Sequence, residues 1–229
     1  SDLQDGLNRY DGNQVKIFKN DPDDPQSLSN SYVSVIFTDQ AGSLWVGTAN
    51  GLNRFNPGSE RFTRYLNDPN NKNSISSNNI TVIYQDRNGT LWVGTGDSGL
   101  NKFDAQTGNF KRYQHIENNF TTISHNNIRS IFEDHSGILW IGTYGGGLNR
   151  LNRKTGDFFN YKPNPQDRHS ISHENIISIY EDSNNNLWVG TDGGGLDQLN
   201  RELDQFIHYK VSPNDTNSIS HNSITNIYE

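Results

Sequence analysis

One motif, a tryptophan segment followed by a glycine-rich stretch, recurs four times in this chain and constrains its fold more than any other feature. The copies read GSLWVGTANGLNRF from Gly42, GTLWVGTGDSGLNKF from Gly89, GILWIGTYGGGLNRL from Gly137 and NNLWVGTDGGGLDQL from Asn185. Successive tryptophans are separated by 47, 48 and 48 residues: Trp45, Trp92, Trp140 and Trp188. Self-similarity at a fixed period of this length is typical of a repeat architecture, in which each copy is one structural unit.

Each repeat contains four short apolar segments separated by turn residues. In the last full copy they cover residues 176–180, 187–191, 196–199 and 206–209. The first, IISIY, is continuously apolar and rich in β-branched residues, which predicts a strand buried on both faces. Before each tryptophan segment stands a Gly, or Asn185 in the last copy, as a hairpin turn with positive φ requires. Four short antiparallel strands per repeat predict the blade of a β-propeller.

The predicted fold is therefore all-β, a β-propeller of four-stranded antiparallel blades that forms a single domain over residues 1–229. The complete repeats cover about 27–73, 74–121, 122–169 and 170–217, between partial blades at 1–19 and 218–229. Residues 6–18 would supply the last two strands of one blade, and residues 218–228 the first strand of another. Joined head to tail, the two pieces would make a fifth blade that lacks its tryptophan strand.

Two arrangements of these blades stay open at this point. One is a closed five-bladed ring with an incomplete blade, and the other is a fragment of a larger ring. A fragment would expose strand edges, which favours a homodimer formed by strand pairing or swapping.

Composition excludes several classes of function. The formal net charge is −7 with a pI near 5.4, and Lys and Arg are not clustered, so neither nucleic acid nor an anionic membrane is expected as a partner. The sequence contains no apolar run long enough to span a bilayer, so we expect neither a membrane span nor a signal peptide within these residues. The chain has no Cys, which removes disulfides, zinc–thiolate sites and cysteine nucleophiles. It also has no Met, so we expect an excised or mature piece of a longer protein.

The order SIS, IYED, LWVGT, GLN and F..Y resembles the two-component regulator propeller repeat of bacterial sensor proteins. Five SLS, SIS or TIS openings carry the resemblance across the whole chain: Ser27–Ser29, Ser74–Ser76, Thr122–Ser124, Ser170–Ser172 and Ser218–Ser220. The family's rings are usually seven-bladed and precede a transmembrane segment and a kinase, cyclase or DNA-binding output. The resemblance thus implies a sensor domain in the periplasm or another extracytoplasmic space, and it leaves the ligand open.

Two glycine motifs imitate chemical sites. Residues Gly94–Gly99 satisfy G-x-G-x-x-G, but a dinucleotide site needs a helix next, and the following LNKF reads as a strand. The overlapping GDSG resembles the nucleophile loop of chymotrypsin-like proteases, yet no other repeat has Ser there and no His lies nearby in sequence. Both motifs are interpreted as turns, and no catalytic residue and no cofactor is predicted.

A third motif imitates a calcium loop. Asp182, Asn184 and Asn186 match its first three ligand positions, but Leu187 and Gly193 stand where it needs Gly and a bidentate Glu. Because every other repeat also places Asp at the first of these positions, capping of the turn is the favoured explanation.

Three histidines recur 48 residues apart, just before the first strand of a blade: His125, His173 and His221. That strand lies nearest the channel of a propeller, so three imidazoles there could bind a metal ion or an anion. Asn30 and Ser77 hold the same position in earlier repeats, and structural metal sites normally close with four ligands. We therefore predict hydrogen bonds within the loop and no metal, and keep the histidines as candidate ligand contacts.

The repeats differ most in the loop between their second and third strands, which shares a face with the blade-to-blade connections. The varied position holds Asn50, Asp97, Tyr144 and Asp192. A constant framework with one changing residue is arranged like a set of interchangeable contacts. Tyr144 could stack on a sugar ring, and the other three could accept hydrogen bonds from hydroxyls. The prediction is a site for a polar small molecule such as an oligosaccharide, against the alternative of solvated loop tips without a ligand.

Two other functions remain as alternatives to sensing. One is a propeller-fold lyase or hydrolase acting on polysaccharide, for which His173, His221 and Tyr144 would be the only catalytic candidates. The other is a protein interaction platform that binds no small molecule. Fold alone does not decide among them.

Overall fold

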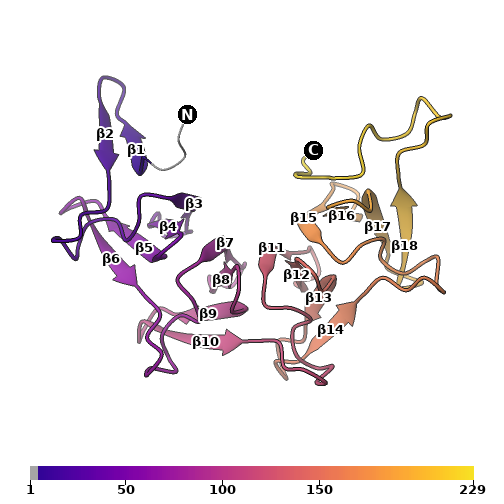
Figure 1. The fold of residues 1–229 in the computed structure, drawn as a ribbon, viewed down its shortest axis with the longest axis horizontal. Helices are drawn as coiled ribbons and strands as arrows, with labels where there is room; N and C mark the ends of the chain where they lie inside the picture. Colours follow the sequence, from indigo (N-terminus) through magenta and orange to yellow (C-terminus); the bar gives the residue numbers. More distant parts are fainter. Residues whose placement is uncertain (1–4) are drawn as a thin grey trace. The chain divides into compact units, whose positions relative to one another are not determined.

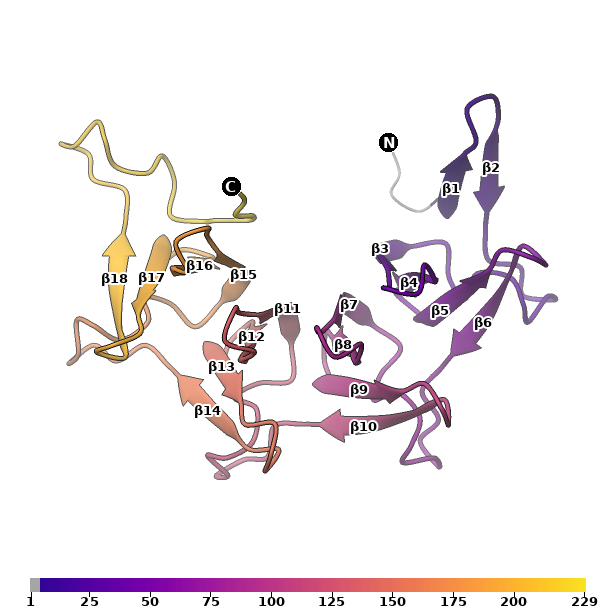
Figure 2. The ribbon, with the colours of Figure 1, turned by 180° about the vertical axis from the view of Figure 1, so that it is seen from behind.

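The computed structural model describes residues 5–229, which build two compact units divided between Arg112 and Tyr113. The described residues contain 18 strands and no helix, in four four-stranded sheets and one two-stranded sheet, as Figures 1 and 2 show from opposite sides. Within every sheet the strands follow one another in chain order and pair antiparallel where register is defined. This is the blade meander predicted from the repeats, and the fold is an all-β propeller type.

The first unit holds a hairpin and two blades. Its strands are β1 Leu7–Tyr10 and β2 Val15–Phe18, then β3 Val33–Thr38, β4 Leu44–Thr48, β5 Gly51–Asn56 and β6 Arg61–Tyr65, then β7 Ile80–Gln85, β8 Leu91–Thr95, β9 Leu100–Asp104 and β10 Asn109–Tyr113. The hairpin of β1 and β2 corresponds to the last two strands of a blade, as predicted.

The second unit holds two further blades and the C-terminal segment. Its strands are β11 Ile128–Glu133, β12 Leu139–Thr143, β13 Leu148–Leu151 and β14 Phe158–Tyr161, then β15 Ile176–Glu181, β16 Leu187–Thr191, β17 Leu196–Asn200 and β18 Gln205–Tyr209. The glycine motif at Gly94–Gly99 is followed by strand β9 and not by a helix, which confirms that it is a turn.

An aspartate organises the turn before every tryptophan strand. In the third blade, Oδ1 of Asp134 accepts a hydrogen bond from the backbone N–H of Ile138, and its Oδ2 accepts one from Nε1 of Trp140, both at 2.9 Å. The other blades repeat the carboxylate–indole bond at 2.9 Å: Asp39–Trp45, Asp86–Trp92 and Asp182–Trp188. The turn residue between them has positive φ in every blade, 79° at Gly137 and 65° at Asn185. The prediction of turn capping is confirmed, because both oxygens of Asp182 serve the turn.

These hydrogen bonds make one blade turn sensitive to acid. Bonds from Trp188 and Asn186 lower the pKa of Asp182 from 3.8 to about 2. A lowered folded-state pKa stabilises the fold fully above the unfolded value and loses that contribution as pH falls through the folded value. We therefore expect urea midpoints of the native chain to fall between pH 4 and pH 2. The Asp182→Asn variant should be less stable at pH 7 and show a smaller fall, and an equally steep fall in both proteins would contradict this assignment.

Aromatic layers join neighbouring blades within each unit. In the second unit the indole of Trp140 packs on Tyr161 with ring centroids 5.8 Å apart, and Tyr161 meets Phe206 of the next blade edge to face at 5.5 Å. The glycine two residues after the tryptophan allows strand β15 of the next blade to approach closely, because a Cβ on Gly142 would lie 2.7 Å from Cγ2 of Ile176. The constant LWVGT sequence thus reflects packing between blades.

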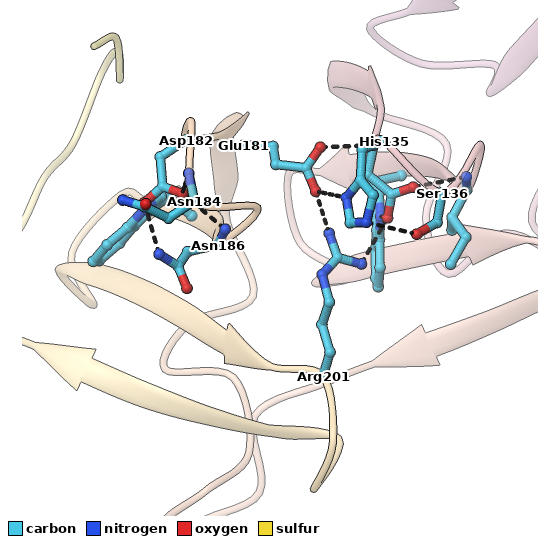
Figure 3. Close-up of polar contacts among 11 residues, drawn as sticks. His135, Ser136, Glu181, Asp182, Asn184, Asn186 and Arg201 are labelled. Atoms are coloured by element: carbon cyan, nitrogen blue, oxygen red, sulfur yellow. Dashed lines mark hydrogen bonds and ion pairs between the residues drawn. The ribbon is translucent and has the colours of Figure 1, made fainter.

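Charged side chains join the same two blades at their turns, as Figure 3 shows. Glu181, at the end of β15, accepts hydrogen bonds from the backbone N–H of His135 at 2.6 Å and from its Nδ1 at 2.7 Å. Arg201 bridges the carboxylates of Glu181 at 2.6 Å and Asp134 at 2.7 Å. The side chains of Asp134 and Glu181 are only 0% and 7% exposed, so Arg201 neutralises two buried charges.

Two strand predictions need correction. Strand β15 is not buried on both faces, because only Ile176 and Ser178 are buried and the other four residues are partly exposed. Alternate side chains face opposite sides of the sheet, and only one side is tightly covered. Residues 218–229 form no extended strand and make a single bridge, from Ser223 to Asp192. In the complete blades the first strand pairs with the tryptophan strand that follows it, and residues 218–229 pair with no such strand among residues 5–229.

Candidate functional site

A buried polar cluster supports each loop between the second and third strands. In the third blade, Oγ1 of Thr143 donates to the carbonyl of Gly147 at 2.8 Å. The side chain of Asn149 accepts the backbone N–H of Ser124 at 2.8 Å and donates to the carbonyl of Ile141 at 3.2 Å. Thr143 and Asn149 are both 0% exposed. The buried side chains of Thr143 and Asn149 are therefore hydrogen-bonded, and they connect the loop to the segment that leads into the blade.

The glycines of this loop bind it to the next blade. The backbone N–H groups of Gly145 and Gly147 both donate to the carbonyl of Glu174, at 3.3 and 2.7 Å. Gly147 has φ of +80°, and a Cβ there would lie 2.1 Å from the carbonyl oxygen of Tyr161. Only glycine fits such a position. The glycine run is thus hydrogen-bonded to the next blade, which holds the variable residue of the loop in a defined position.

Two predicted site residues meet on neighbouring blades of the second unit. The hydroxyl of Tyr144 donates to Oδ2 of Asp192 at 3.4 Å, and Ser223 donates to Oδ1 of Asp192 through its hydroxyl. The guanidinium of Arg129 lies 5.5 Å from the centroid of the Tyr144 ring, in cation–π geometry. Tyr144 is still 38% exposed. These four residues, Arg129, Tyr144, Asp192 and Ser223, form what we call the Tyr144 cluster.

The three histidines have the same local role. Nδ1 accepts the backbone N–H two residues on, from Asn127 to His125 at 3.1 Å, from Asn175 to His173 at 3.0 Å and from Ser223 to His221 at 2.9 Å. An accepting Nδ1 leaves Nε2 as the nitrogen that carries the ring N–H. Burial lowers the pKa of His125, and nearby His115 and Lys162 lower it further, against the opposing charge of Glu174. Nε2 is the ring atom left to donate to a ligand.

His125 and His173 also lie against the loop glycines. A Cβ on Gly145 would be 3.4 Å from Nε2 of His125, and one on Gly193 would be 3.5 Å from Nε2 of His173. The histidines therefore lie beside the same loops that carry Tyr144 and Asp192. Over residues 5–229, no three His, Cys, Asp or Glu side chains gather in a metal-binding arrangement.

The first unit holds the other two candidates. Oδ1 of Asn50 accepts a hydrogen bond from the side chain of Asn78 at 3.1 Å, again between a loop and the segment leading into the next blade. Asp97 is exposed. Asn50 is thus connected to its neighbouring blade, as Tyr144 is in the second unit.

Arg129, Ser223 and Asn78 belong to these contacts and were not among the predicted site residues. Each of them contacts a predicted loop residue that lies 15 to 31 residues away in the sequence: Arg129 contacts Tyr144, Ser223 contacts Asp192 and Asn78 contacts Asn50. Asn78 and Ser223 lie in segments that lead into a first strand, where polar residues recur in every repeat, whereas Arg129 lies within strand β11 and no sequence signal pointed to it.

Comparison with known proteins assigns the repeats. The two component regulator propeller family matches residues 27–50, 74–97, 122–145 and 170–193, which are the leading segment, first strand, tryptophan strand and loop of each complete blade. These are two-component regulator propeller repeats. No curated protein sequence matches the chain. No described segment forms a helix with the length and apolar character needed to cross a membrane.

Solved structures share the fold. The extracellular domain of a protein described as a hybrid two component system, from B. thetaiotaomicron, is 25% identical with a TM-score of 0.75 over 89% of this chain and 27% of its own. A second extracellular domain from B. thetaiotaomicron, described as that of a one component system or of a hybrid two component system, is 24% identical with a TM-score of 0.64, over 90% of this chain and 35% of its own. PorZ, a surface component of the type-IX secretion system of Porphyromonas gingivalis, is 18% identical with a TM-score of 0.68, over 97% and 33%. The chain thus spans about a third or less of each structure's length.

Proposed function

We propose that this chain is part of the ligand-sensing propeller of a bacterial signalling receptor and acts outside the cytoplasm. The likeness to an extracellular domain of a hybrid two component system at 25% identity supports the sensor role and the location. The repeats supply a constant framework, and they differ most in the loop between the second and third strands.

The ligand we propose is a polar small molecule of the oligosaccharide class, bound at the Tyr144 cluster. The observation that supports this choice is the half-exposed ring of Tyr144 beside the carboxylate of Asp192. An aromatic face packs on the apolar face of a sugar, and a carboxylate accepts hydrogen bonds from adjacent hydroxyls. Nε2 of His173 supplies a donor beside the loop of Asp192.

The test is a thermal-shift screen of the chain against plant, algal and host oligosaccharides, followed by chromatography of each mixture. A ligand at ~100 times Kd should stabilise the folded state by about 2.7 kcal/mol. Tyr144→Ala should weaken binding at least about tenfold, equivalent to ~1.4 kcal/mol. The matched control is Tyr228→Ala, since Tyr228 lies in the same unit and is 85% exposed.

Each outcome has a distinct meaning. A shift that depends on Tyr144, with the sugar recovered intact, supports the sensor. New products in the chromatogram would replace it with a polysaccharide lyase or hydrolase. No shift across the panel would favour the interaction platform, and a shift unaffected by Tyr144→Ala would place the site elsewhere.

A further inference from the structure

A small cavity of about 180 Å³ lies beside the β1–β2 hairpin in the first unit. Five of its lining residues are apolar and two are polar: Leu7, Phe18, Ile36, Leu44 and Phe55, with Asn8 and Arg9. The hairpin supplies one wall of the cavity, and the first four-stranded blade supplies the other. None of these residues belongs to the Tyr144 cluster, so a role for the cavity is independent of the proposed function.

The repeat shows what such a cavity holds when it is full. One repeat further along, the seven positions are Leu52, Asn53, Arg54, Tyr65, Ile83, Leu91 and Phe103. Five of these residues surround the indole of Trp45: Leu52, Ile83, Leu91 and Phe103 in its buried cluster, with Tyr65 packed against it. Ring centroids lie 5.3 Å from Trp45 to Phe103 and 5.7 Å to Tyr65, and the guanidinium of Arg54 lies 5.6 Å from the indole.

The exposure of one isoleucine shows the difference between the cavity and the filled Trp45 pocket. Ile83 contacts the Trp45 cluster and is 5% exposed, whereas the equivalent Ile36 is 53% exposed. Arg9 has no indole to cover, and its guanidinium lies 5.7 Å from the ring of Phe18. The cavity is therefore lined like the pocket that holds Trp45, but no tryptophan of residues 5–229 fills it.

The edge of strand β1 beside the cavity corresponds to the edge of β5 that pairs with a tryptophan strand. In the complete blade, β5 pairs with the tryptophan strand in the register Trp45 to Arg54 and Val46 to Asn53. The side chain of Asn53 donates to the carbonyl of Val46 at 3.1 Å. Strand β1 pairs only with β2 among the described strands, and the side chain of Asn8 has no hydrogen-bond partner among the described residues. An unpaired strand edge is a template for another strand.

We propose that the cavity and the free edge of β1 together bind an extended strand of the Leu-Trp-Val/Ile-Gly-Thr type that lies outside residues 5–229. The strand adds antiparallel to β1, with its tryptophan opposite Arg9 and the next residue opposite Asn8. Main-chain hydrogen bonds supply affinity, and the tryptophan pocket supplies specificity, as in other cases of strand addition. The chemistry recognised is that of a propeller-repeat tryptophan strand.

The test uses the whole chain and a fluorophore-labelled peptide with the sequence of residues 43–49, SLWVGTA. Fluorescence anisotropy should show binding of this peptide and at least a tenfold loss when its tryptophan is replaced by alanine. Equal binding of the two peptides would overturn the proposal, and so would the absence of binding. A dimer of the chain that blocks the peptide, seen by light scattering, would replace the proposed strand by a second copy.

Matched variants locate the binding to the cavity. Ile36→Glu places a charge in the wall formed by β3 and should abolish peptide binding. The control is Ile17→Glu, which should leave binding unchanged, because Ile17 lies on β2, is 52% exposed and is outside the lining. Arg9→Ala, which should weaken binding severalfold, serves as the second test if Ile36→Glu fails to fold. Unchanged binding in the cavity variants would refute the site.

Discussion

Replacing Trp140 by alanine is expected to destabilise the second unit by about 4 kcal/mol. The side chain is 1% exposed and packs against Tyr161, so its removal leaves a large cavity between two blades. It also removes the Nε1 donor that serves the buried carboxylate of Asp134. Urea unfolding followed by far-UV circular dichroism would measure the loss.

Trp140→Phe separates the two contributions. Phenylalanine keeps an aromatic ring in the layer but has no N–H, so Asp134 loses one partner and the cost should stay near 1–3 kcal/mol. If alanine costs no more than phenylalanine, the aromatic layer does not carry the contact between these blades.

The strands and turns could be predicted because their causes lie close together in sequence. Alternation of apolar residues marks each strand, and the Asp, Gly and Trp of one turn lie within six residues of each other. The same holds for the histidines, whose Nδ1 contacts lie two residues away. The predicted bond within the loop therefore appears in the structure, while a role for these histidines in ligand binding stays a prediction.

Contacts between blades were harder to predict. Glu181 binds His135 across 46 residues, and Tyr144 meets Asp192 across 48. Tyr144 and Asp192 could be selected as candidates because they vary against a constant framework, but that pattern does not say which of them touch. Period alone places equivalent positions on successive blades, whereas contact depends on side-chain length and direction.

The C-terminal segment shows a limit of another kind. Residues 218–229 carry the sequence of a first strand, yet they form a single bridge. The segment still docks on its neighbour, since the carboxylate of Glu229 accepts hydrogen bonds from the backbone and hydroxyl of Ser183 at 2.8 and 2.7 Å. Strand propensity in a short segment needs a pairing partner to become a strand, and the sequence of the segment does not show whether one is present.

Replacing Arg201 by methionine is expected to destabilise the second unit by about 3 kcal/mol at pH 7, because two buried carboxylates lose their shared counter-charge. Arg61→Met is the matched control: Arg61 pairs with Asp24 at an exposed position, and its loss should cost less than about 1 kcal/mol. Urea unfolding suits both measurements since urea adds no salt.

The pH dependence of the Arg201→Met deficit tests the electrostatic cause directly. Burial raises the pKa of Asp134, but in the native chain the hydrogen bonds from Trp140, Arg201 and the N–H of Ile138, together with the charge of Arg201, hold this pKa below 3.8. Without Arg201, burial raises the folded-state pKa of Asp134. Protonation of Asp134 then removes the unpaired buried charge as pH falls, which stabilises the variant relative to its state at pH 7. The deficit should therefore be smaller at pH 5 than at pH 7. A deficit that stays constant with pH would mean that Arg201 acts through the packing of its methylene groups and not through the charge of Asp134.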